Sequence, residues 1–242
     1  MEDFAQALEQ TALEQGLDLS PELCGKLACH WRLLQQANEK FNITAIRQAE
    51  DGINKHYLDS LLPAAKIAAC QPRLAADIGS GGGFPGLVLA AFMPECEFVL
   101  LEANAKKTAF LQQAAQAMEL PNVRALPLRA ETAAKKEDWY RRFDLVLGRA
   151  VAHAGILVEY AMPLLKPGGS LFLYKGPRGE EELRQAAPAL AEFSAEIREI
   201  WPYSLPPEEK RLLCHIVAGE VCPAKYTRRE GMAEKRPLCP TD

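Results

Sequence analysis

The sequence lacks the features that mark several large classes of protein. Its seven cysteines include no C-x-x-C pair, which argues against a zinc site or a disulfide framework and favours reduced thiols, so no metal is expected. No apolar stretch approaches the ~18 residues of a membrane span. The acidic start Met1-Glu2-Asp3-Phe4 lacks the basic beginning of a signal peptide. These absences predict a cytoplasmic protein with no membrane partner.

The sequence also has no excess of positive charge. A formal net charge of −4, with 48% hydrophobic and 25% charged residues, is typical of an ordinary globular protein. A nucleic-acid partner would have to meet a local basic patch rather than the whole surface. The chain of 242 residues is long enough for one large domain with an extension.

Helical spacing of apolar residues dominates residues 1–70. Ser20 and Pro21 form a good N-cap and first-position pair for a helix that carries Trp31. Asp51 is expected to cap a further helix that contains Tyr57. We therefore expect a helical N-terminal extension.

From residue 74 onward, short apolar runs alternate with helical stretches. Strands are expected at 74–78, 98–101, 123–128, 143–147 and 170–174, and helices at 85–92, 104–118 and 153–165. A Lys-Pro-Gly-Gly turn at 166–169 precedes the fifth strand, and two later strands, near 195–201 and 212–218, could form an edge hairpin. This alternation predicts an α/β, doubly wound parallel sheet. The expected segments are the extension (1–70), the α/β domain (71–221) and a basic C-terminal tail (222–242).

A glycine-rich loop lies between the first expected strand and the helix that follows it. It has five glycines within residues 79–86, and its pattern predicts a nucleotide site, since glycines let the backbone approach a ligand closely. Glu102 ends the second strand, where an acid can accept hydrogen bonds from ribose hydroxyls.

The residue before the loop bears on the identity of the nucleotide. Residues 81–86 match G-x-G-x-x-G, the pattern of an NAD-dependent oxidoreductase, which stays an alternative. Asp77, however, gives Asp-x-Gly-x-Gly-x-Gly, which includes Gly79 and Gly81 and resembles motif I of class I S-adenosylmethionine-dependent methyltransferases. A carboxylate would repel a pyrophosphate but favours the ammonium and sulfonium of S-adenosylmethionine. Asp77 therefore favours a methyl donor.

The ends of the next two strands supply further candidates. Ala130 and Glu131 follow the third strand, where this fold usually meets the adenine, and Arg149 follows the fourth, where ligands gather. Arg149 could pair with a carboxylate or a phosphate. The sequence has neither an Asn/Asp-Pro-Pro-Tyr motif after the fourth strand nor a Pro-Cys nucleophile. Both absences permit an acceptor such as guanine N7, which carries no proton and needs alignment rather than a general base.

The chain resembles the RsmG (GidB) family, bacterial guanine-N7 methyltransferases of small-subunit rRNA, from about residue 41 to 238. The segments that carry this resemblance are 42–46, 56–61, 77–86, 149–152 and 225–231. The resemblance implies a seven-stranded, Rossmann-like class I fold and cofactor contacts from Gly79, Phe84, Ala130, Glu131 and Arg149. It also implies methylation of N7 of guanine 527 in 16S rRNA, within the small ribosomal subunit or its precursor. Arg149 is then expected to position the substrate, and we expect a monomer.

Two further groups of residues are candidates for contact with the substrate. The tail has five positive and two negative charges between Lys225 and Leu238, and we expect RNA contacts from Lys225, Tyr226, Arg228, Arg229 and Lys235, although a solvated end explains the pattern about as well. His56, Asp59 and Ser60 share a helical face. A structural hydrogen-bond network is the simpler interpretation of that face, and the resemblance adds a possible place on the substrate side. His30, His153 and His215 are interpreted as structural. A noncatalytic rRNA-binding assembly protein with a nucleotide pocket stays a second alternative.

Overall fold

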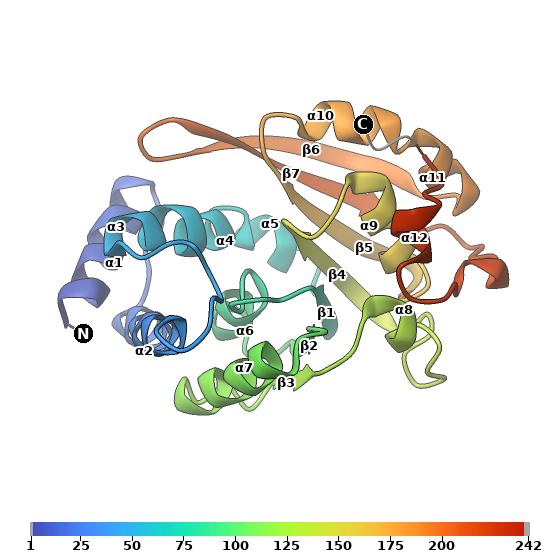
Figure 1. Cartoon of the computed structure of the whole chain (residues 1–242). Coiled ribbons are helices and arrows are strands. Elements are labelled where there is room, and N and C mark those ends of the chain that lie inside the picture. Colours follow the sequence, from blue (N-terminus) through green and yellow to red (C-terminus); the bar gives the residue numbers. More distant parts are fainter. Residues whose placement is uncertain (1, 240–242) are drawn as a thin grey trace. The chain divides into compact units, whose positions relative to one another are not determined.

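The computed structural model describes residues 2–239, which divide into two compact units (Figure 1). One unit comprises Met1–Gln71 and Ser80–Pro127, and the other comprises Pro72–Gly79 and Leu128–Asp242. The units do not follow the expected segment boundaries at residues 70 and 222, which stay predictions. The expected tail includes residues 240–242, which lie outside the described residues.

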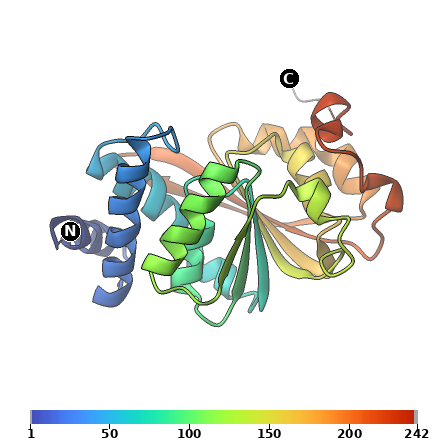
Figure 2. The same ribbon diagram turned by 60° about the horizontal axis from the view of Figure 1, so that its bottom comes forward.

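The first unit contains the N-terminal helices and part of the α/β region. Its helices are α1 (Glu2–Glu14), α2 (Pro21–Asn38), α3 (Ala49–Gly52), the π-helix η1 (Ile53–Leu58), α4 (Asp59–Leu61), α5 (Ala64–Ala68), α6 (Gly86–Phe92) and α7 (Ala105–Ala117). Its strands are β2 (Glu97–Leu101) and β3 (Val123–Leu126). Helix α2 lies between α1 and α7 and contacts both (Figure 2).

Local signals predicted one helix start correctly and another incorrectly. Ser20 caps α2 as expected, since its hydroxyl accepts the Leu23 N–H at 3.2 Å and Pro21 occupies the first turn. The expected cap at Asp51 is wrong, because α3 already begins at Ala49. Asp51 lies inside the helix and instead pairs with Lys55 at 2.7 Å. An acidic residue is favoured both as the cap before a helix and within its first turn, so the sequence alone does not separate these two positions.

The second unit contains the rest of the sheet and the C-terminal helices. Its strands are β1 (Leu74–Ile78), β4 (Phe143–Arg149), β5 (Leu165–Lys175), β6 (Glu196–Leu205) and β7 (Glu209–Val217). Its helices are α8 (Ala130–Ala133), α9 (Ala154–Ala161), α10 (Gly179–Gln185), α11 (Ala187–Glu192), the 3₁₀-helix η2 (Ala224–Tyr226) and α12 (Met232–Lys235). Helix α9 packs on β5 and contacts α8, α10, α11 and α12 (Figure 1).

The strands form a seven-stranded sheet with the order β3-β2-β1-β4-β5-β7-β6. The pairs β2/β3, β1/β4 and β4/β5 are parallel, whereas β7 is antiparallel to both β5 and β6. The expected α/β doubly wound fold and the late hairpin are confirmed. The middle of strand β4 is apolar, and Leu145, Val146 and Leu147 are all fully buried, as expected for a parallel strand covered on both faces.

Two expected boundaries around α9 differ from the structure. The helix was expected to span 153–165 but ends at Ala161, since Pro163 cannot continue it and the chain must enter β5. His153 lies just before the helix and caps it through Nδ1, which accepts the Gly155 N–H at 3.4 Å. The expected turn at 166–169 lies within β5 as an irregularity, with Gly168 at φ 72°. Among residues 2–239, no helix combines the length and apolar character needed to cross a bilayer.

Candidate functional site

The glycine-rich loop is a tight turn held by its own backbone. Gly79, Gly81 and Gly83 adopt positive φ values of 67°, 54° and 94°, which favour glycine. In the first unit, the Ser80 carbonyl oxygen accepts the Gly83 N–H at 2.7 Å, and the Ser80 backbone N–H donates to the Leu101 carbonyl at 3.3 Å. A Cβ on Gly83 would lie 2.5 Å from Leu87 Cδ1, so the turn also lacks space for a side chain there.

Glu102 is oriented by the loop and by the helix that follows it. Its Oε2 accepts the Gly81 N–H at 3.0 Å, and its Oε1 accepts the Asn104 N–H at 2.8 Å. The residue is 9% exposed. Because an ionised carboxylate has about four acceptor positions, two backbone donors fix its direction and leave capacity for ligand hydroxyls. The expected ribose-binding residue is therefore held in one orientation.

Phe84 packs into an aromatic cluster of the N-terminal helices. Its ring stacks on His56 with centroids 4.2 Å apart, and it also contacts His30 and Tyr57. His56 Nε2 lies 2.9 Å from Thr44 Oγ1. Phe84 is only 5% exposed, so its side chain serves the core. The cofactor contact that the family implies at this position would have to come from its backbone.

The three residues expected on one helical face lie in or directly after the π-helix η1. The π-helix covers His56, and Asp59 and Ser60 follow it as buried residues. Ser60 donates its hydroxyl hydrogen to the His56 carbonyl at 2.7 Å. This contact agrees with the interpretation of these residues as a structural hydrogen-bond network. Their place on the substrate side of the cofactor pocket stays a prediction.

Sequence reasoning missed the partners of His30. This histidine is completely buried, with Nε2 2.8 Å from the Gly82 carbonyl oxygen and Nδ1 3.0 Å from the Tyr57 hydroxyl. Burial lowers the pKa of His30 to about 4, against a smaller opposing effect of the bond to Gly82. The partners lie 27 and 52 residues away in the sequence, so no local motif could have revealed them.

In the second unit, β1 and β4 bring three predicted residues to one edge of the sheet. The parallel register pairs Asp77 with Leu147 and Ile78 with Gly148, so Gly79, directly after β1, and Arg149, the last residue of β4, lie at adjacent strand ends. Asp77 is 1% exposed, and Arg149 is half-buried. A Cβ on Gly79 would lie 2.7 Å from Val151 Cγ2. Ligands of open α/β sheets bind at such carboxyl ends.

Ala130 and Glu131 open helix α8 as buried residues. Glu131 Oε1 accepts the Gly231 N–H at 2.8 Å, which joins this helix to a residue 100 positions later. The carboxylate expected near adenine thus supports the C-terminal segment, residues 222–239. Sequence reasoning assigned no such role to Glu131.

The C-terminal segment is folded onto the second unit. Arg228 makes a two-pronged ion pair with Glu159 of α9, and Glu159 is buried to 3% exposure. Burial raises the pKa of Glu159, and Arg228 opposes this effect. Glu159 interrupts an otherwise apolar helix, and that interruption is the signal that could have predicted a buried cationic partner.

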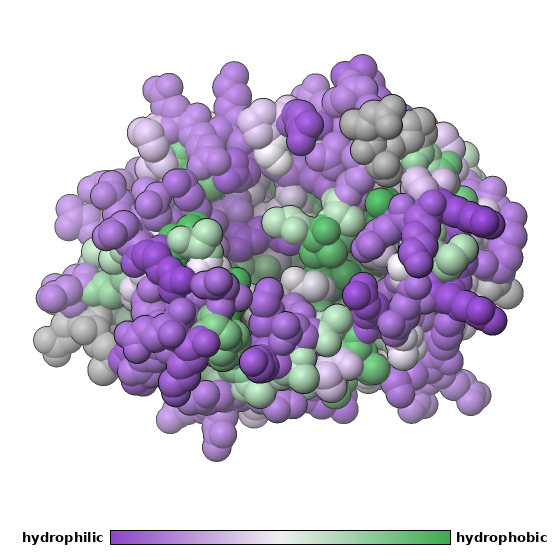
Figure 3. Space-filling model, viewed as in Figure 1, coloured by the Kyte–Doolittle hydropathy of each residue, from purple (hydrophilic) through white to green (hydrophobic). Residues whose placement is uncertain are grey.

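The five predicted RNA-contacting residues of this segment fall into two groups. Lys225 pairs with Glu192 at 2.8 Å, and Tyr226 packs on Phe193 with ring centroids 4.9 Å apart. Together with Arg228, they make contacts within the protein. Arg229 and Lys235 are exposed. Strongly hydrophilic residues gather on the right of Figure 3, over α12 and the chain near it.

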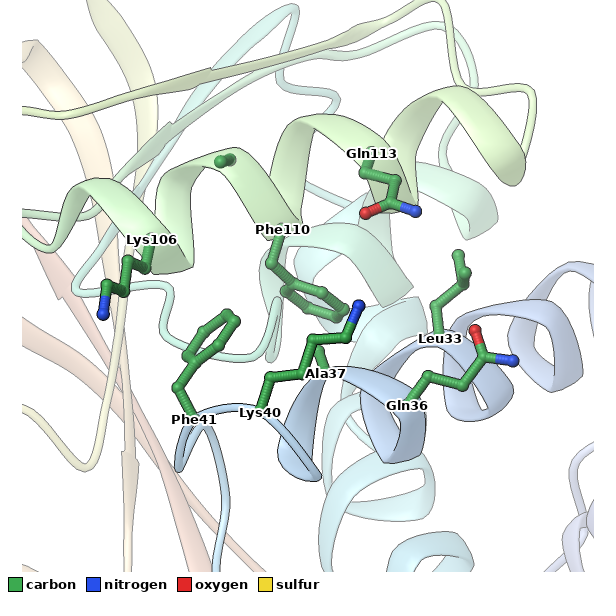
Figure 4. Close-up of a pocket in the computed structure, with 9 residues that line it drawn as sticks. Leu33, Gln36, Ala37, Lys40, Phe41, Lys106, Phe110 and Gln113 are labelled. Carbon is green, nitrogen blue, oxygen red and sulfur yellow. The ribbon is translucent and has the colours of Figure 1, made fainter.

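A separate pocket of about 210 Å³ lies in the first unit between α2 and α7. Figure 4 shows Phe110 and Gln113 reaching from α7 toward Leu33 and Lys40. Its other lining residues are Gln36, Ala37, Phe41, Lys106 and Ala109. No predicted cofactor or RNA residue lines this pocket, and we assign it no ligand.

The chain matches the family model GidB, described as rRNA small subunit methyltransferase G, over residues 24–203. It belongs to the GidB family. Ribosomal RNA small subunit methyltransferase G of Moorella thermoacetica is 36% identical over 98% of this chain and 100% of the relative, and that of Deinococcus deserti is 37% identical over 94% and 93%. This GidB-family chain also shares its fold with an O-methyltransferase from Bacillus cereus in complex with SAH. That structure is 19% identical, has a TM-score of 0.58 and covers 87% of this chain and 97% of its own.

Proposed function

We propose that this protein transfers a methyl group from S-adenosylmethionine to N7 of a guanine in small-subunit ribosomal RNA, at the position numbered 527 in 16S rRNA. The observation that carries the proposal is the GidB family match over residues 24–203. Relatives named ribosomal RNA small subunit methyltransferase G align with nearly the whole chain. The substrate would be the small subunit or its precursor, and such a substrate would place the protein in the cytoplasm. We expect it to act as a monomer.

The residues present fit S-adenosylmethionine better than a dinucleotide. The two acids around the glycine loop, Asp77 and Glu102, are both buried. The carboxylate of Asp77 would repel a pyrophosphate but favours the cofactor's ammonium, whereas Glu102 suits the ribose hydroxyls of either nucleotide. We propose that the cofactor is held by Asp77, Gly79, Gly81, Glu102, Ala130, Glu131 and Arg149 and by the backbone of Phe84. When bound, the cofactor supplies a methyl group on a positively charged sulfur.

The acceptor needs no deprotonation by the protein. Guanine N7 has a free ring lone pair, so alignment of this nitrogen with the methyl carbon contributes most of the acceleration. We assign Arg149 to this alignment, because it ends β4 at the edge of the sheet where ligands of this fold bind. Within the described part of the chain, His, Cys, Asp and Glu side chains form no group of three or more that could hold a metal ion.

We propose that the RNA is contacted by the exposed Arg229 and Lys235, whose charge is available for phosphates. Lys225 and Arg228 engage acids of the protein itself, so we assign them, with Tyr226, to holding the C-terminal segment in place. His56, Asp59 and Ser60 are assigned to supporting the loop from the N-terminal helices.

The deciding experiment maps N7-methylguanine on small-subunit RNA from cells with and without the gene. We expect the modification to disappear without the gene and to return with the wild-type protein but not with Glu102→Ala. Retention of the mark without the gene would contradict the proposal and favour a noncatalytic assembly protein. Calorimetric titration with NADH and with S-adenosylmethionine separates the oxidoreductase alternative, because we expect heat of binding only from the latter.

A further inference from the structure

His30 joins the N-terminal helices to the glycine-rich loop through two hydrogen bonds. It lies on α2, completely buried, between the Tyr57 hydroxyl and the Gly82 carbonyl. The Phe84 ring packs against both aromatic partners, with centroids 5.0 Å from His30 and 5.3 Å from Tyr57. The loop thus rests on a polar pair inside an apolar cluster.

The chemistry of the partners fixes the proton positions. A carbonyl oxygen can only accept, so Nε2 of His30 carries the hydrogen that is donated to Gly82. Burial keeps the ring neutral at physiological pH by lowering its pKa to about 4, so Nδ1 has a lone pair. The Tyr57 hydroxyl must then donate to Nδ1. The Gly82 carbonyl therefore fixes the tautomer of His30, and the Tyr57 hydroxyl holds the ring in place by donating to its other nitrogen.

We propose that His30 and Tyr57 are positioning residues for the cofactor loop, which hold the Gly82 carbonyl and thereby aim the Gly81 N–H at Glu102. The proposal rests on the proposed function, since it takes Glu102 to be the ribose-binding residue. The chain of contacts runs from Tyr57 to His30 to Gly82, and from the adjacent Gly81 to Glu102 Oε2 at 3.0 Å.

Contacts to the backbone of the loop matter because its three consecutive glycines offer no side chains that could anchor it. Gly81, Gly82 and Gly83 have no side chains to pack, and glycine loses more conformational freedom on ordering than any other residue. An unanchored loop would have to be ordered when the cofactor binds, which lowers affinity. The pair on α2 and η1 orders the loop in advance, so its effect should fall on cofactor affinity and not on the transfer step.

The test measures cofactor binding and kinetics in the full-length protein. Tyr57→Phe removes one hydroxyl, which leaves the buried Nδ1 of His30 without a donor and loosens the ring that holds Gly82. We expect a roughly fivefold higher Kd and KM for S-adenosylmethionine, with kcat at saturating cofactor unchanged. His30→Leu should weaken binding more. His30→Gln, which keeps an amide donor and an acceptor, should restore much of the affinity.

The matched control is Phe4→Leu. Phe4 packs on Trp31 and Tyr57, with ring centroids 5.2 and 5.5 Å away, so this change loosens the same helices without touching either hydrogen bond. We expect it to lower the melting temperature but leave the Kd for the cofactor unchanged. Hydrogen exchange at the amides of residues 81–83 should accelerate in Tyr57→Phe and His30→Leu but not in Phe4→Leu.

Unchanged cofactor affinity in both Tyr57→Phe and His30→Leu would overturn the positioning role while leaving the proposed function intact. A Kd that changes equally in Phe4→Leu would also overturn it, because the effect would then follow helix stability. Failure of the proposed function is distinguishable from failure of the positioning role. If the wild-type protein binds no S-adenosylmethionine, the proposed function fails. Faster amide hydrogen exchange at residues 81–83 in the variants would then still show that His30 and Tyr57 order the loop.

Discussion

Glu102 shows how the surroundings of a single carboxylate can prepare it for a ligand. Two backbone N–H groups, from Gly81 and Asn104, each occupy one oxygen. Charge-assisted hydrogen bonds of this kind are stronger and shorter than neutral ones. The same carboxylate therefore orders the loop and keeps acceptor positions for the ribose hydroxyls that we propose it binds.

Glu102→Ala should weaken S-adenosylmethionine binding by roughly 1–3 kcal/mol, because a charged acceptor is removed and two backbone donors are left without their partner. Isothermal titration calorimetry measures this directly. Glu97→Ala is the control, since Glu97 lies at the other end of the same strand in an exposed pair with Arg124 at 3.5 Å. An unchanged affinity in Glu102→Ala would contradict the ribose-binding role.

His30 should make the stability of the protein depend on pH. Its pKa is about 4 in the folded state, below its ordinary value of 6.5, so between these values the unfolded state binds more protons. Stability is therefore lost as the pH falls from about 6.5 to about 4, by at most about 3 kcal/mol from this group. The unfolding free energy of His30→Gln, measured by urea denaturation, should fall less over that pH range than that of the wild type. An equal fall in both proteins would argue against a buried neutral imidazole.

At the scale of elements, the C-terminal segment is a folded part of the second unit. Ala233 and Cys239 are buried, and a Cβ on Gly155 of α9 would lie 1.9 Å from Cys239 Sγ. Arg228 and Gly231 bond to Glu159 and Glu131, which lie on two different helices. Deleting the segment would uncover buried acids, so point substitutions report on its roles more cleanly than truncation.

Arg228→Met should destabilise the protein by about 3–5 kcal/mol near neutral pH, because it leaves the Glu159 carboxylate buried without its cation. Removing Arg228 raises the pKa of Glu159 further, so the folded state holds a proton that the unfolded state releases above about pH 4.5. The destabilisation should therefore be smaller at pH 5 than at pH 8. Arg229→Met, at an exposed position, is the control and should change the unfolding free energy little.

At the scale of the whole molecule, an acidic chain must meet a polyanion. The net charge of −4 gives no general attraction to RNA, so binding depends on exposed cations that keep their charge free. Of the five predicted residues, Lys225, Arg229 and Lys235 are exposed, and Lys225 pairs with Glu192, so we propose that Arg229 and Lys235 meet the RNA.

The double variant Arg229→Ala/Lys235→Ala should bind small ribosomal subunits more weakly. The slope of the logarithm of the binding constant against the logarithm of the salt concentration should also become shallower, by about one for each phosphate that the protein no longer neutralises. Filter binding at several salt concentrations measures both. Lys210→Ala, an exposed lysine at the start of β7, is the control. If the double variant matched the control, the residues that bind RNA would have to lie elsewhere.

The sequence determined the features that depend on neighbouring residues. Apolar runs of strand length, the glycines of the loop and the Ser20 cap act over a few positions, so their pattern predicted the parallel sheet, the loop and the start of α2. The place of Glu102 directly after β2 followed from the same local pattern, whereas its ribose-binding role stays a prediction. The prediction that Asp51 caps a helix was wrong, because an acid suits the first turn of a helix as well as the cap position, and Asp51 lies in the first turn.

Tertiary structure alone decided which polar groups meet across long separations. Tyr57 reaches His30 over 27 residues, Gly231 reaches Glu131 over 100, and Arg228 reaches Glu159 over 69. Burial makes each of these interactions strong, since a buried polar group without a partner is costly. No residue's type reveals its distant partner, because that choice is made when the helices and the sheet pack together.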